Sequence, residues 1–341
     1  MRACFRKAIR RRTGRNKRNA SWNVTYRIGG KRQKPCRCPP ILPMGVDRVK
    51  ECRLCPRNCG AVRGELRGEG FCRCGTEAVI SRAALHMWEE PVISGSSGSG
   101  TVFFSGCGLG CVFCQNYAIS SELRGKVYSP RDLARVMYEL EGQGAHNISF
   151  VTGTHYAEAI IRALQIYRPG IPTVWNSGGY ECVATLRRLS EYIDIWLPDY
   201  KFALPEVAAK YAFAPDYPTV AMEAIQFMCE SAGGNLIEDG IMKRGVIVRH
   251  LVLPRNVRNS IAALRKIRSE LPKDTLVSIM SQYTPSGHIS EFPELGRRLT
   301  ASEYDKVLDA ADSLGIAGFK QELSSAAEEY VPAFDLSEPG G

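Results

Sequence analysis

Three cysteines with the spacing C-x3-C-x2-C are the residues of this chain best suited to chemistry. Cys107, Cys111 and Cys114 follow a short apolar run at residues 101–105 and stand among glycines. Thiolates are soft ligands, and three of them on one short loop can hold three irons of a 4Fe–4S cluster. The next cysteine along the chain is Cys182, so one iron would stay open to a substrate or cofactor.

Two simpler interpretations compete with a cluster: a structural zinc knuckle, or three unconnected buried cysteines. Free cysteines are commonly buried, so any one of the three would be ordinary by itself. The joint pattern is more specific, because an aromatic residue, Phe113, precedes the third cysteine. Gly106, Gly108 and Gly110 also let the backbone wrap closely around a bulky inorganic group. The pattern therefore favours an iron–sulfur cluster.

With these residues the chain resembles the radical S-adenosylmethionine (SAM) superfamily, whose hallmark is a C-x3-C-x-aromatic-C loop. The resemblance implies that Cys107, Cys111 and Cys114 hold a 4Fe–4S cluster. The amino and carboxylate groups of SAM would chelate its open iron, and Phe113 would pack near the adenine. An electron from the reduced cluster would then cleave SAM to methionine and a 5′-deoxyadenosyl radical, which abstracts hydrogen from a substrate.

Across residues 52–320 the chain looks like the branch named for its similarity to pyruvate formate-lyase activating enzymes. That branch carries a Cys-x-Leu-Cys-Pro-Arg-x-Cys segment, as at residues 52–59, and a Trp-Glu-Glu-Pro segment, as at residues 88–91. The resemblance implies an activating-enzyme-like oxidoreductase with an unknown substrate and an electron donor such as flavodoxin or ferredoxin. Glycyl-radical installation on a protein is the nearest characterised chemistry. Modification of a small molecule, a peptide or RNA is the alternative.

A second cysteine group precedes this loop, with Cys52, Cys55, Cys59, Cys72 and Cys74 in a segment rich in Arg and Gly. Thiols at these distances can close a tetrahedral zinc site or bind a second iron–sulfur cluster. A structural zinc would supply folding energy, and a cluster would relay electrons. The sequence leaves both open. Since Cys74 matches no position of the family pattern, the predicted ligands are the other four.

The charge of the chain is concentrated at its beginning. The net charge is +10, but residues 1–50 hold 16 Lys or Arg and one acid, leaving 29 basic and 34 acidic residues in the rest. Low hydrophobicity without periodicity predicts disorder for residues 1–48. This arm would bind nucleic acid or an anionic surface, direct the chain to an organelle, or be an upstream extension with translation starting near Met44. We favour the last.

Composition predicts a cytoplasmic protein. No stretch approaches the roughly 18–20 apolar residues of a membrane helix. Thirteen cysteines in a chain of 341 residues indicate metal sites in a reducing compartment, because disulfide scaffolds are short. A class without catalysis is also open: a zinc-binding protein that binds nucleic acid through its basic arm.

After residue 100, short β-branched or aromatic runs alternate with amphipathic patterns. Strands are predicted at residues 101–105, 147–152, 172–176, 193–198, 246–254 and 275–283. Helices are predicted at residues 129–144, 156–167, 181–191, 218–231, 260–270 and 300–314. Strands that alternate with helices indicate a parallel sheet, since each crossover returns the chain in the same direction. Ser129 and Asp132 predict the N-terminal cap of the first helix.

The predicted fold class is therefore α/β: a partial (β/α)6 TIM-like barrel, as the resemblance implies, with an N-terminal cysteine-rich metal-binding segment. We divide the chain into an extension at residues 1–48, the cysteine-rich segment at 49–95, the barrel at 96–325 and a tail at 326–341. Barrel chemistry lies at the carboxyl ends of the strands, which is where the loop of Cys107 would lie.

The resemblance also assigns residues to SAM at later strand ends. Gly153 is what remains of a Gly-Gly-Glu-like turn that contacts the SAM amino group, with Thr152 and Thr154 as weaker candidates. Asn176, Ser177 and Asp199 would bind a monovalent cation, for which oxygen ligands are suited. Lys201 would offer its charge to the SAM carboxylate. A solvent-exposed Asp199–Lys201 pair is the structural alternative.

Seven further residues are interpreted from their context in the chain. Arg249 lies inside an apolar run, so we expect it to point into the barrel and meet a carboxylate. His250 should then point to the other face and be structural. His155 is either a proton donor or a contact of SAM, or else a packed or capping residue. Glu89 and Glu90 are interpreted as a solvated turn before Pro91. Gln282 and Tyr283 are expected at the mouth of the barrel.

Overall fold

A mostly parallel sheet runs through residues 51–323, the part of the chain that the computed structural model describes. Its strands are β1 (Ala78–His86), β2 (Ser99–Phe104), β3 (Lys126–Tyr128), β4 (Ile148–Val151), β5 (Thr173–Ser177), β6 (Ile195–Pro198), β7 (Leu236–Glu238), β8 (Ile241–Leu251), β9 (Leu276–Met280) and β10 (Gly318–Lys320). Their spatial order is β10-β9-β8-β6-β5-β4-β2-β1-β3, with β7 paired to β8. The ends of this order do not pair with each other, so the sheet is an open arc.

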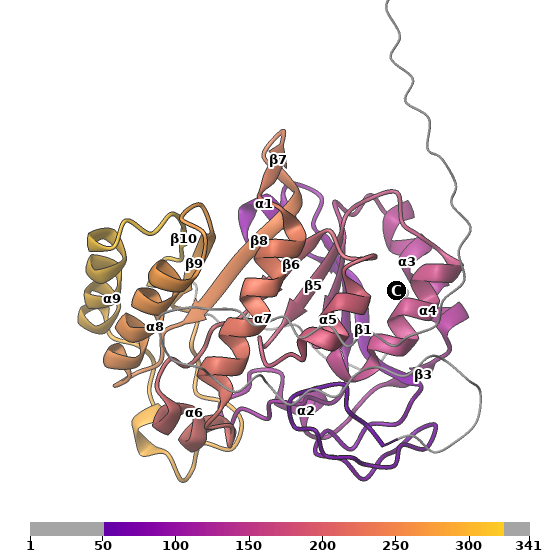
Figure 1. The fold of residues 1–341 in the computed structure, drawn as a ribbon, viewed down its shortest axis with the longest axis horizontal. Coiled ribbons are helices and arrows are strands. Elements are labelled where there is room, and N and C mark those ends of the chain that lie inside the picture. The colour runs from indigo at the N-terminus through magenta and orange to yellow at the C-terminus, as the bar shows by residue number, and fades with distance from the viewer. Residues whose placement is uncertain (1–50, 324–341) are drawn as a thin grey trace, which may run out of the picture. The chain divides into compact units, whose positions relative to one another are not determined.

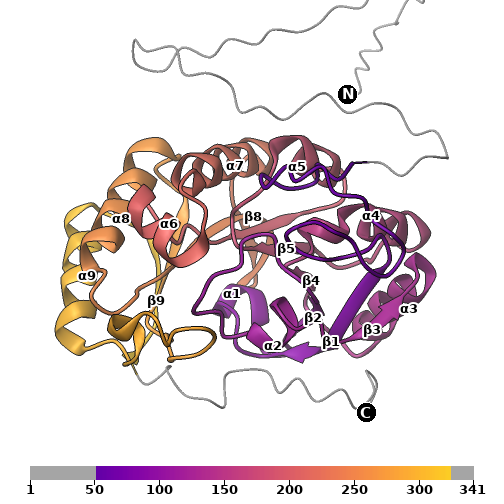
Figure 2. The same cartoon turned by 90° about the horizontal axis from the view of Figure 1, so that it is seen from below.

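Helices connect the parallel strands. They are α1 (Pro91–Ser94), α2 (Tyr117–Ser120), α3 (Pro130–Gly142), α4 (Ala157–Ile166), α5 (Val183–Leu189), α6 (Pro205–Ala212), α7 (Tyr217–Ala232), α8 (Val257–Glu270) and α9 (Ala301–Ser313), with single 3₁₀ turns at Thr154–Tyr156 and Pro293–Leu295. In Figure 2 the helices α3, α4, α5, α7, α8 and α9 lie on the outer side of the arc of strands. This is the layering expected of a partial barrel.

The predicted barrel strands correspond to β2, β4, β5, β6, β8 and β9. Neighbours in this series pair in parallel, from β2 with β4 to β8 with β9. The predicted helices correspond to α3, α4, α5, α7, α8 and α9. The α/β partial barrel is therefore confirmed, and a further short parallel strand, β10, extends it beside β9.

The sequence did not predict the antiparallel strands. β1 lies within residues 49–95, yet it pairs with both β2 and β3 and so belongs to the sheet. We use the name cysteine-rich segment below for residues 51–77, which end before β1. The sequence of β1, Ala-Val-Ile-Ser-Arg-Ala-Ala-Leu-His, alternates only weakly, so its strand character depends on pairing with β2. The predicted extension at residues 1–48 and the tail at 326–341 lie outside the described residues.

The first predicted helix is capped as expected. In α3, the Ser129 hydroxyl accepts from the Asp132 backbone N–H at 3.2 Å, and the Asp132 carboxylate accepts from the Ser129 N–H at 3.2 Å. This reciprocal arrangement satisfies two N–H groups that a helix end otherwise leaves unpaired. The apolar face buries Leu133, Val136, Met137 and Leu140.

Alternate residues of the strands pack on opposite sides of the sheet. Trp175 and Trp196 belong to the main core that the outer helices cover. Val174 and Ile195, their neighbours in sequence, pack instead with Ile93 of α1 in a second cluster. Both sides of the sheet are therefore apolar, which leaves the ends of the strands as the place for polar chemistry. Among the described residues no helix is long and apolar enough to cross a membrane.

Candidate active site

A cavity of about 400 Å³ lies at the carboxyl ends of the parallel strands. The loop that follows β2, residues 106–116, forms one wall and is called the cluster loop below; it leads into α2, at the lower edge of Figure 1. From this loop Cys107, Cys111, Phe113 and Cys114 line the cavity. The opposite wall comes from the ends of β4, β5, β6 and β8, so the cavity is where a barrel fold places chemistry.

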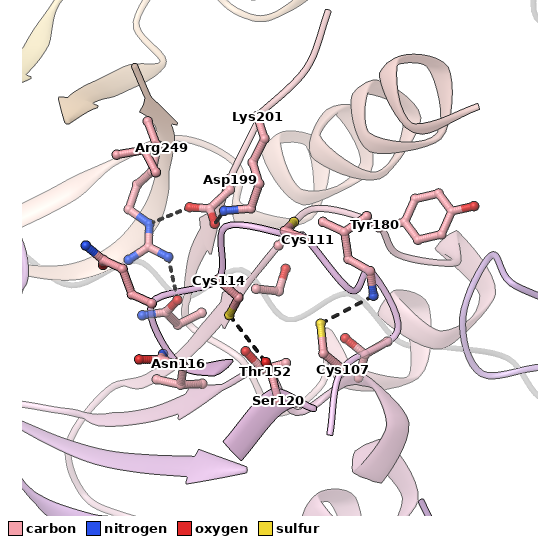
Figure 3. A pocket seen from close by; sticks show the side chains of 18 of the residues that line it. Cys107, Cys111, Cys114, Asn116, Ser120, Thr152, Tyr180, Asp199, Lys201 and Arg249 are labelled. Carbon is pink, nitrogen blue, oxygen red and sulfur yellow. Dashed lines mark hydrogen bonds and ion pairs between the residues drawn. The ribbon is translucent and has the colours of Figure 1, made fainter. Parts of the chain in front are cut away.

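Two of the three thiols of the cluster loop accept hydrogen bonds (Figure 3). Cys107 Sγ accepts from the Leu109 backbone N–H at 3.3 Å, and Cys114 Sγ accepts from the Ser120 hydroxyl at 3.4 Å. Burial raises the pKa of the Cys107 and Cys111 thiols, and the nearby Lys201 ammonium counteracts part of this for both. A metal must displace the thiol protons when it binds. Three soft donors beside a cation fit an anionic iron–sulfur cluster.

Phe113 is buried inside an aromatic group. Its ring meets three others edge-on at 6.1 to 6.3 Å, those of Phe202, Tyr211 and Tyr283. Tyr283 was expected at the mouth of the barrel, and this is wrong: it is fully buried, and its hydroxyl donates to the Leu295 carbonyl at 2.7 Å. Gln282 does line the cavity. Phe113 therefore links the cavity wall to the core.

The turn after β4 contributes three side chains to the cavity: Thr152, Thr154 and His155. Gly153 instead turns its Cα toward the core, where an added Cβ would lie 2.7 Å from Ile160 and 3.0 Å from the Trp175 ring. His155 Nε2 donates to the Ser105 carbonyl at 2.7 Å, directly before the cluster loop. Burial lowers the pKa of His155 to about 4, so its ring is neutral near pH 7.

Asp199 and Arg249 form the centre of the opposite wall. The Arg249 guanidinium donates through Nε to Asp199 Oδ1 at 3.0 Å, and through Nη2 to Asn176 Oδ1 at 2.5 Å. Lys201 Nζ pairs with the other Asp199 oxygen. Burial raises the pKa of Asp199, but the Lys201 and Arg249 cations outweigh it and hold that pKa below its ordinary value. The expectation that Arg249 points inward to a carboxylate is confirmed.

The structure places the other expected residues of this wall in different surroundings. Ser177 lines the cavity, and its hydroxyl accepts from the Gly179 N–H at 3.3 Å. His250 is fully buried on the other side, where Nδ1 donates to the Tyr200 carbonyl at 2.7 Å, as a structural role requires. The Asp199–Lys201 pair is not solvent-exposed, since the two side chains are 10% and 16% exposed.

Glu89 and Glu90 correct the sequence interpretation. They are not a solvated turn: they lead into α1, which packs into the inner cluster, and both are largely buried, with Glu90 8% exposed and the Glu89 side chain 10% exposed. Glu89 Oε2 accepts from Arg249 Nη1 at 3.1 Å, and its Oε1 accepts from Asn176 Nδ2 at 3.2 Å. Glu89 thus completes the charged wall. The Trp-Glu-Glu-Pro pattern was the only signal for it in the sequence.

Glu181 is a cavity residue that the sequence analysis missed. Its Oε1 accepts from the Thr154 hydroxyl at 2.7 Å and from Trp175 Nε1 at 3.4 Å. Its Oε2 is buried and has no hydrogen-bond partner among the described residues. Burial raises the pKa of Glu181 to about 7 against the hydrogen bonds that lower it. The sequence predicted only that a helix begins at this residue.

The second cysteine group lies in the segment next to the cluster loop. Cys59 and Cys72 lie near enough to Cys52 for their charges to raise the pKa of its thiol, although burial is the larger cause. Cys55 is buried and lines the cavity. The thiols whose charges act on Cys55 are Cys52 and Cys72, so it groups with them. Across residues 51–323, no three Cys, His, Asp or Glu side chains are arranged to hold a single metal ion.

Comparison with known proteins agrees with this geometry. Residues 101–240 match the model of the radical SAM superfamily. The uncharacterized protein MJ0674 of Methanocaldococcus jannaschii is 31% identical over 291 residues, which span 82% of this chain and 80% of that protein.

Solved structures with a similar fold include SuiB of Streptococcus suis bound to S-adenosylmethionine, 12% identical, with a TM-score of 0.48 over 66% of this chain and 50% of that one. Methylornithine synthase (PylB) is 14% identical, with a TM-score of 0.43 over 73% of this chain and 74% of that one. A domain of a pyruvate-formate lyase-activating enzyme from Bacteroides vulgatus is 8% identical, with a TM-score of 0.31 over 57% and 91%. The family match and the extended relative together establish that this chain belongs to the radical SAM superfamily, whose enzymes use a 4Fe–4S cluster and SAM.

Proposed function

We propose that Cys107, Cys111 and Cys114 hold the 4Fe–4S cluster of this enzyme and that SAM binds in the cavity beside them. One observation carries the proposal: the three thiols and the buried Lys201 ammonium line one cavity, and the charge of Lys201 acts on two of the thiols. A reduced cluster bound at these residues would supply the electron for reductive cleavage of SAM to methionine and a 5′-deoxyadenosyl radical. A donor such as flavodoxin or ferredoxin would provide that electron.

The remaining walls would orient SAM through this chain's own side chains. Lys201 offers a cation to the SAM carboxylate, and Asp199 holds that ammonium in place from its other side. Phe113 would support the adenine from the buried aromatic group. Asn176 and Ser177 present polar groups at the end of β5, and Gly153 would contribute only its backbone. Each of these assignments can be tested by substituting the residue.

Arg249 takes the place of the monovalent cation that the resemblance implied at Asp199, Asn176 and Ser177. Its guanidinium already bonds to Asp199 Oδ1 and Asn176 Oδ1, and Lys201 takes the second Asp199 oxygen. The positive charge at this position therefore comes from the protein. We propose Arg249 as the cofactor-side residue here and include no monovalent cation.

The size of the cavity favours a substrate that reaches in from outside. Ligand cavities in proteins span roughly 300–1,000 Å³. The cavity here, of about 400 Å³, would be largely filled by SAM, which is a nucleoside joined to an amino acid. A substrate would then present its reacting carbon at the mouth. Trp88 lines the cavity and is 57% exposed, which offers an apolar surface there. We therefore propose hydrogen abstraction from a protruding protein segment, as in glycyl-radical activation.

We further propose that Cys52, Cys55, Cys59 and Cys72 form a second metal site, holding zinc or an iron–sulfur cluster. The charges of Cys59 and Cys72 raise the pKa of Cys52, and those of Cys52 and Cys72 raise the pKa of Cys55. Cys59 is exposed at one side of the group and Cys55 is buried against the cavity at the other. Metal analysis of the Cys107→Ala, Cys111→Ala, Cys114→Ala triple variant would identify this metal, because this variant keeps the second of the two proposed sites and lacks the first.

The function is tested on anaerobically purified protein reconstituted with iron and sulfide. After reduction with dithionite and addition of SAM, we expect 5′-deoxyadenosine from the wild type and none from the triple cysteine variant. Cys229→Ala is the matched control, because Cys229 lies in α7 away from the cavity and contacts Thr275. A wild type that binds zinc at the loop and makes no 5′-deoxyadenosine would refute the proposal and favour a non-catalytic zinc protein.

The substrate class is tested in the same assay. A protein fraction of a cell extract should raise 5′-deoxyadenosine formation above the uncoupled rate if the substrate is a protein segment. Stimulation by the small-molecule or RNA fraction alone would contradict the glycyl-type proposal and support modification of a small molecule or RNA.

A further inference from the structure

The cysteine-rich segment, residues 51–77, lies directly against the cluster loop. A Cβ atom on each of three loop glycines would meet a side chain of this segment: Gly106 faces Cys74, Gly108 faces Cys55 and Gly110 faces Phe71. For Gly108 the distance to the sulfur would be 3.3 Å, and for Gly110 the distance to the ring would be 2.9 Å. These glycines therefore allow close contact with the segment as well as the bend of the loop.

Arg57 makes the main polar contact between the two. Its Nε donates to the Gly108 carbonyl at 2.9 Å, and its Nη2 donates to the Leu109 carbonyl at 2.9 Å. The same guanidinium reaches the end of α6, where it donates to the Ala212 carbonyl at 2.7 Å and to the Phe213 carbonyl at 2.6 Å. One side chain thus satisfies four backbone carbonyls from two parts of the chain far from itself in sequence.

The surroundings of Arg57 suit a fixed cation. The carbonyls of Ala212 and Phe213 belong to the carboxyl end of α6, where the helix dipole favours positive charge. The guanidinium lies 4.0 Å from the ring centre of Phe71 and 5.4 Å from that of Tyr180. A planar group with five donors can stack and fork in this way, whereas an ammonium offers only a point charge.

Arg53 shows that this placement is particular to Arg57. It belongs to the same Cys-x-Leu-Cys-Pro-Arg-x-Cys stretch, four residues earlier. Its side chain is 45% exposed and pairs with Glu51 at 2.7 Å and with Asn58 at 3.3 Å, all within the segment. An exposed pair of this kind contributes little to stability. Arg57 instead ties the segment to the cluster loop.

The position of Arg57 links the loop to the second cysteine group. Arg57 stands between Cys55 and Cys59, two of the proposed ligands. Residues 51–77 contain no helix, but their backbone is joined by isolated bridges such as Arg63 with Gly68 and by hydrogen bonds such as that from the Cys52 N–H to the Ala61 carbonyl at 2.9 Å. The segment that carries Arg57 is therefore held together by its own backbone.

We propose that the cysteine-rich segment clamps the cluster loop, with Arg57 as its positioning residue. Arg57 fixes the carbonyls of Gly108 and Leu109, and thereby the course of the loop beside Cys107. The inference rests on the assignment of the cluster to Cys107, Cys111 and Cys114, and it requires nothing of the substrate.

Arg57→Lys tests the clamp, with Arg53→Lys as the matched control in reconstituted full-length protein. Two quantities are measured: SAM affinity, and the rate at which a chelator removes iron from the loop cluster. We expect Arg57→Lys to weaken SAM binding about tenfold, or about 1.4 kcal/mol, and to speed iron loss severalfold. Arg53→Lys should leave both unchanged. If Arg57→Lys does not fold, Phe71→Leu removes the stacking contact while the hydrogen bonds remain, and should change both quantities in the same direction.

Wild-type behaviour of Arg57→Lys and Phe71→Leu, in SAM affinity and in the rate of iron loss, would overturn the clamp. If the wild type keeps its iron but binds no SAM, the proposed function is refuted and the clamp is not, because the rate of iron loss still tests the clamp.

Discussion

The guanidinium of Arg249 and the carboxylate of Asp199 meet at 3.0 Å although 50 residues separate them in the chain. They are register partners, since β6 and β8 are parallel neighbours and the bridge between Asp199 and Arg249 continues their pairing. Sheet register therefore sets the charge pattern of the cavity wall. Glu89 and Lys201 complete it from outside this strand pair.

Removing the central cation should destabilise the fold. Arg249→Met leaves the buried carboxylates of Asp199 and Glu89 facing each other, and breaking a buried pair from one side costs about 3–5 kcal/mol. Urea denaturation measures this loss. Arg135→Met is the control, since Arg135 is 66% exposed in its pair with Asp132 and should cost at most about 1 kcal/mol. An Arg249→Met protein as stable as the control variant would contradict the role of this wall.

Lys201 should recognise the carboxylate end of SAM. Lys201→Met removes the ammonium but leaves Asp199 paired with Arg249, so the fold should persist. We expect SAM affinity to fall about tenfold or more, equivalent to at least about 1.4 kcal/mol, in equilibrium binding. A SAM analogue without the carboxylate should bind wild type and variant alike. Equal losses for SAM and the analogue would show that Lys201 shapes the cavity without contacting the carboxylate.

Glu181 should make stability depend on pH. Burial raises its pKa in the folded protein from 4.5 to about 7, so between these values the folded state keeps a proton that the unfolded chain releases. Its contribution to the free energy of unfolding is complete below about pH 4.5 and is lost as the pH rises to about 7, by on the order of 3 kcal/mol.

Glu181→Gln should remove this dependence, because the amide keeps the size of the side chain and does not titrate. Urea denaturation at several pH values measures the difference in unfolding free energy between wild type and variant. Glu139→Gln, a change at an exposed glutamate of α3, should give a pH profile parallel to the wild type. A Glu181→Gln profile that is also parallel would show that the carboxyl is not protonated in the folded state.

Phe113 should matter both to stability and to SAM. Its ring is 4% exposed and packs against three aromatic rings, so Phe113→Ala should cost about 3–5 kcal/mol of unfolding free energy. Phe113→Leu keeps most of the volume and should cost less. If the aromatic ring supports the adenine, the leucine variant should still fold yet bind SAM more weakly. Unchanged affinity in Phe113→Leu would assign the residue to the core alone.

Local patterns in the sequence were sufficient for the cluster loop and for most of the barrel. The spacing of Cys107, Cys111 and Cys114 is a property of one short loop, and it pointed to the superfamily before any fold was known. The cap at Ser129 and the six strand–helix units were also predicted, because capping and periodicity depend on residues a few positions apart.

Contacts between distant segments could not be predicted in the same way. Glu89 was interpreted as solvated, because its partner Arg249 lies 160 residues further along the chain. β1 was missed because its pattern is weak until it pairs with β2. Glu181 gave no signal at all, since its raised pKa depends on burial that several strands produce together.

Arg57 illustrates what the sequence alone could predict and what required the tertiary structure. The sequence by itself determined the donor set: three thiols on a loop, a second cysteine group, and an arginine within that group. Only the tertiary structure decided that this arginine meets the carbonyls beside Cys107 rather than solvent. The physical reason is that ligand spacing is local in the chain, whereas burial and charge pairing depend on which strands and loops become neighbours.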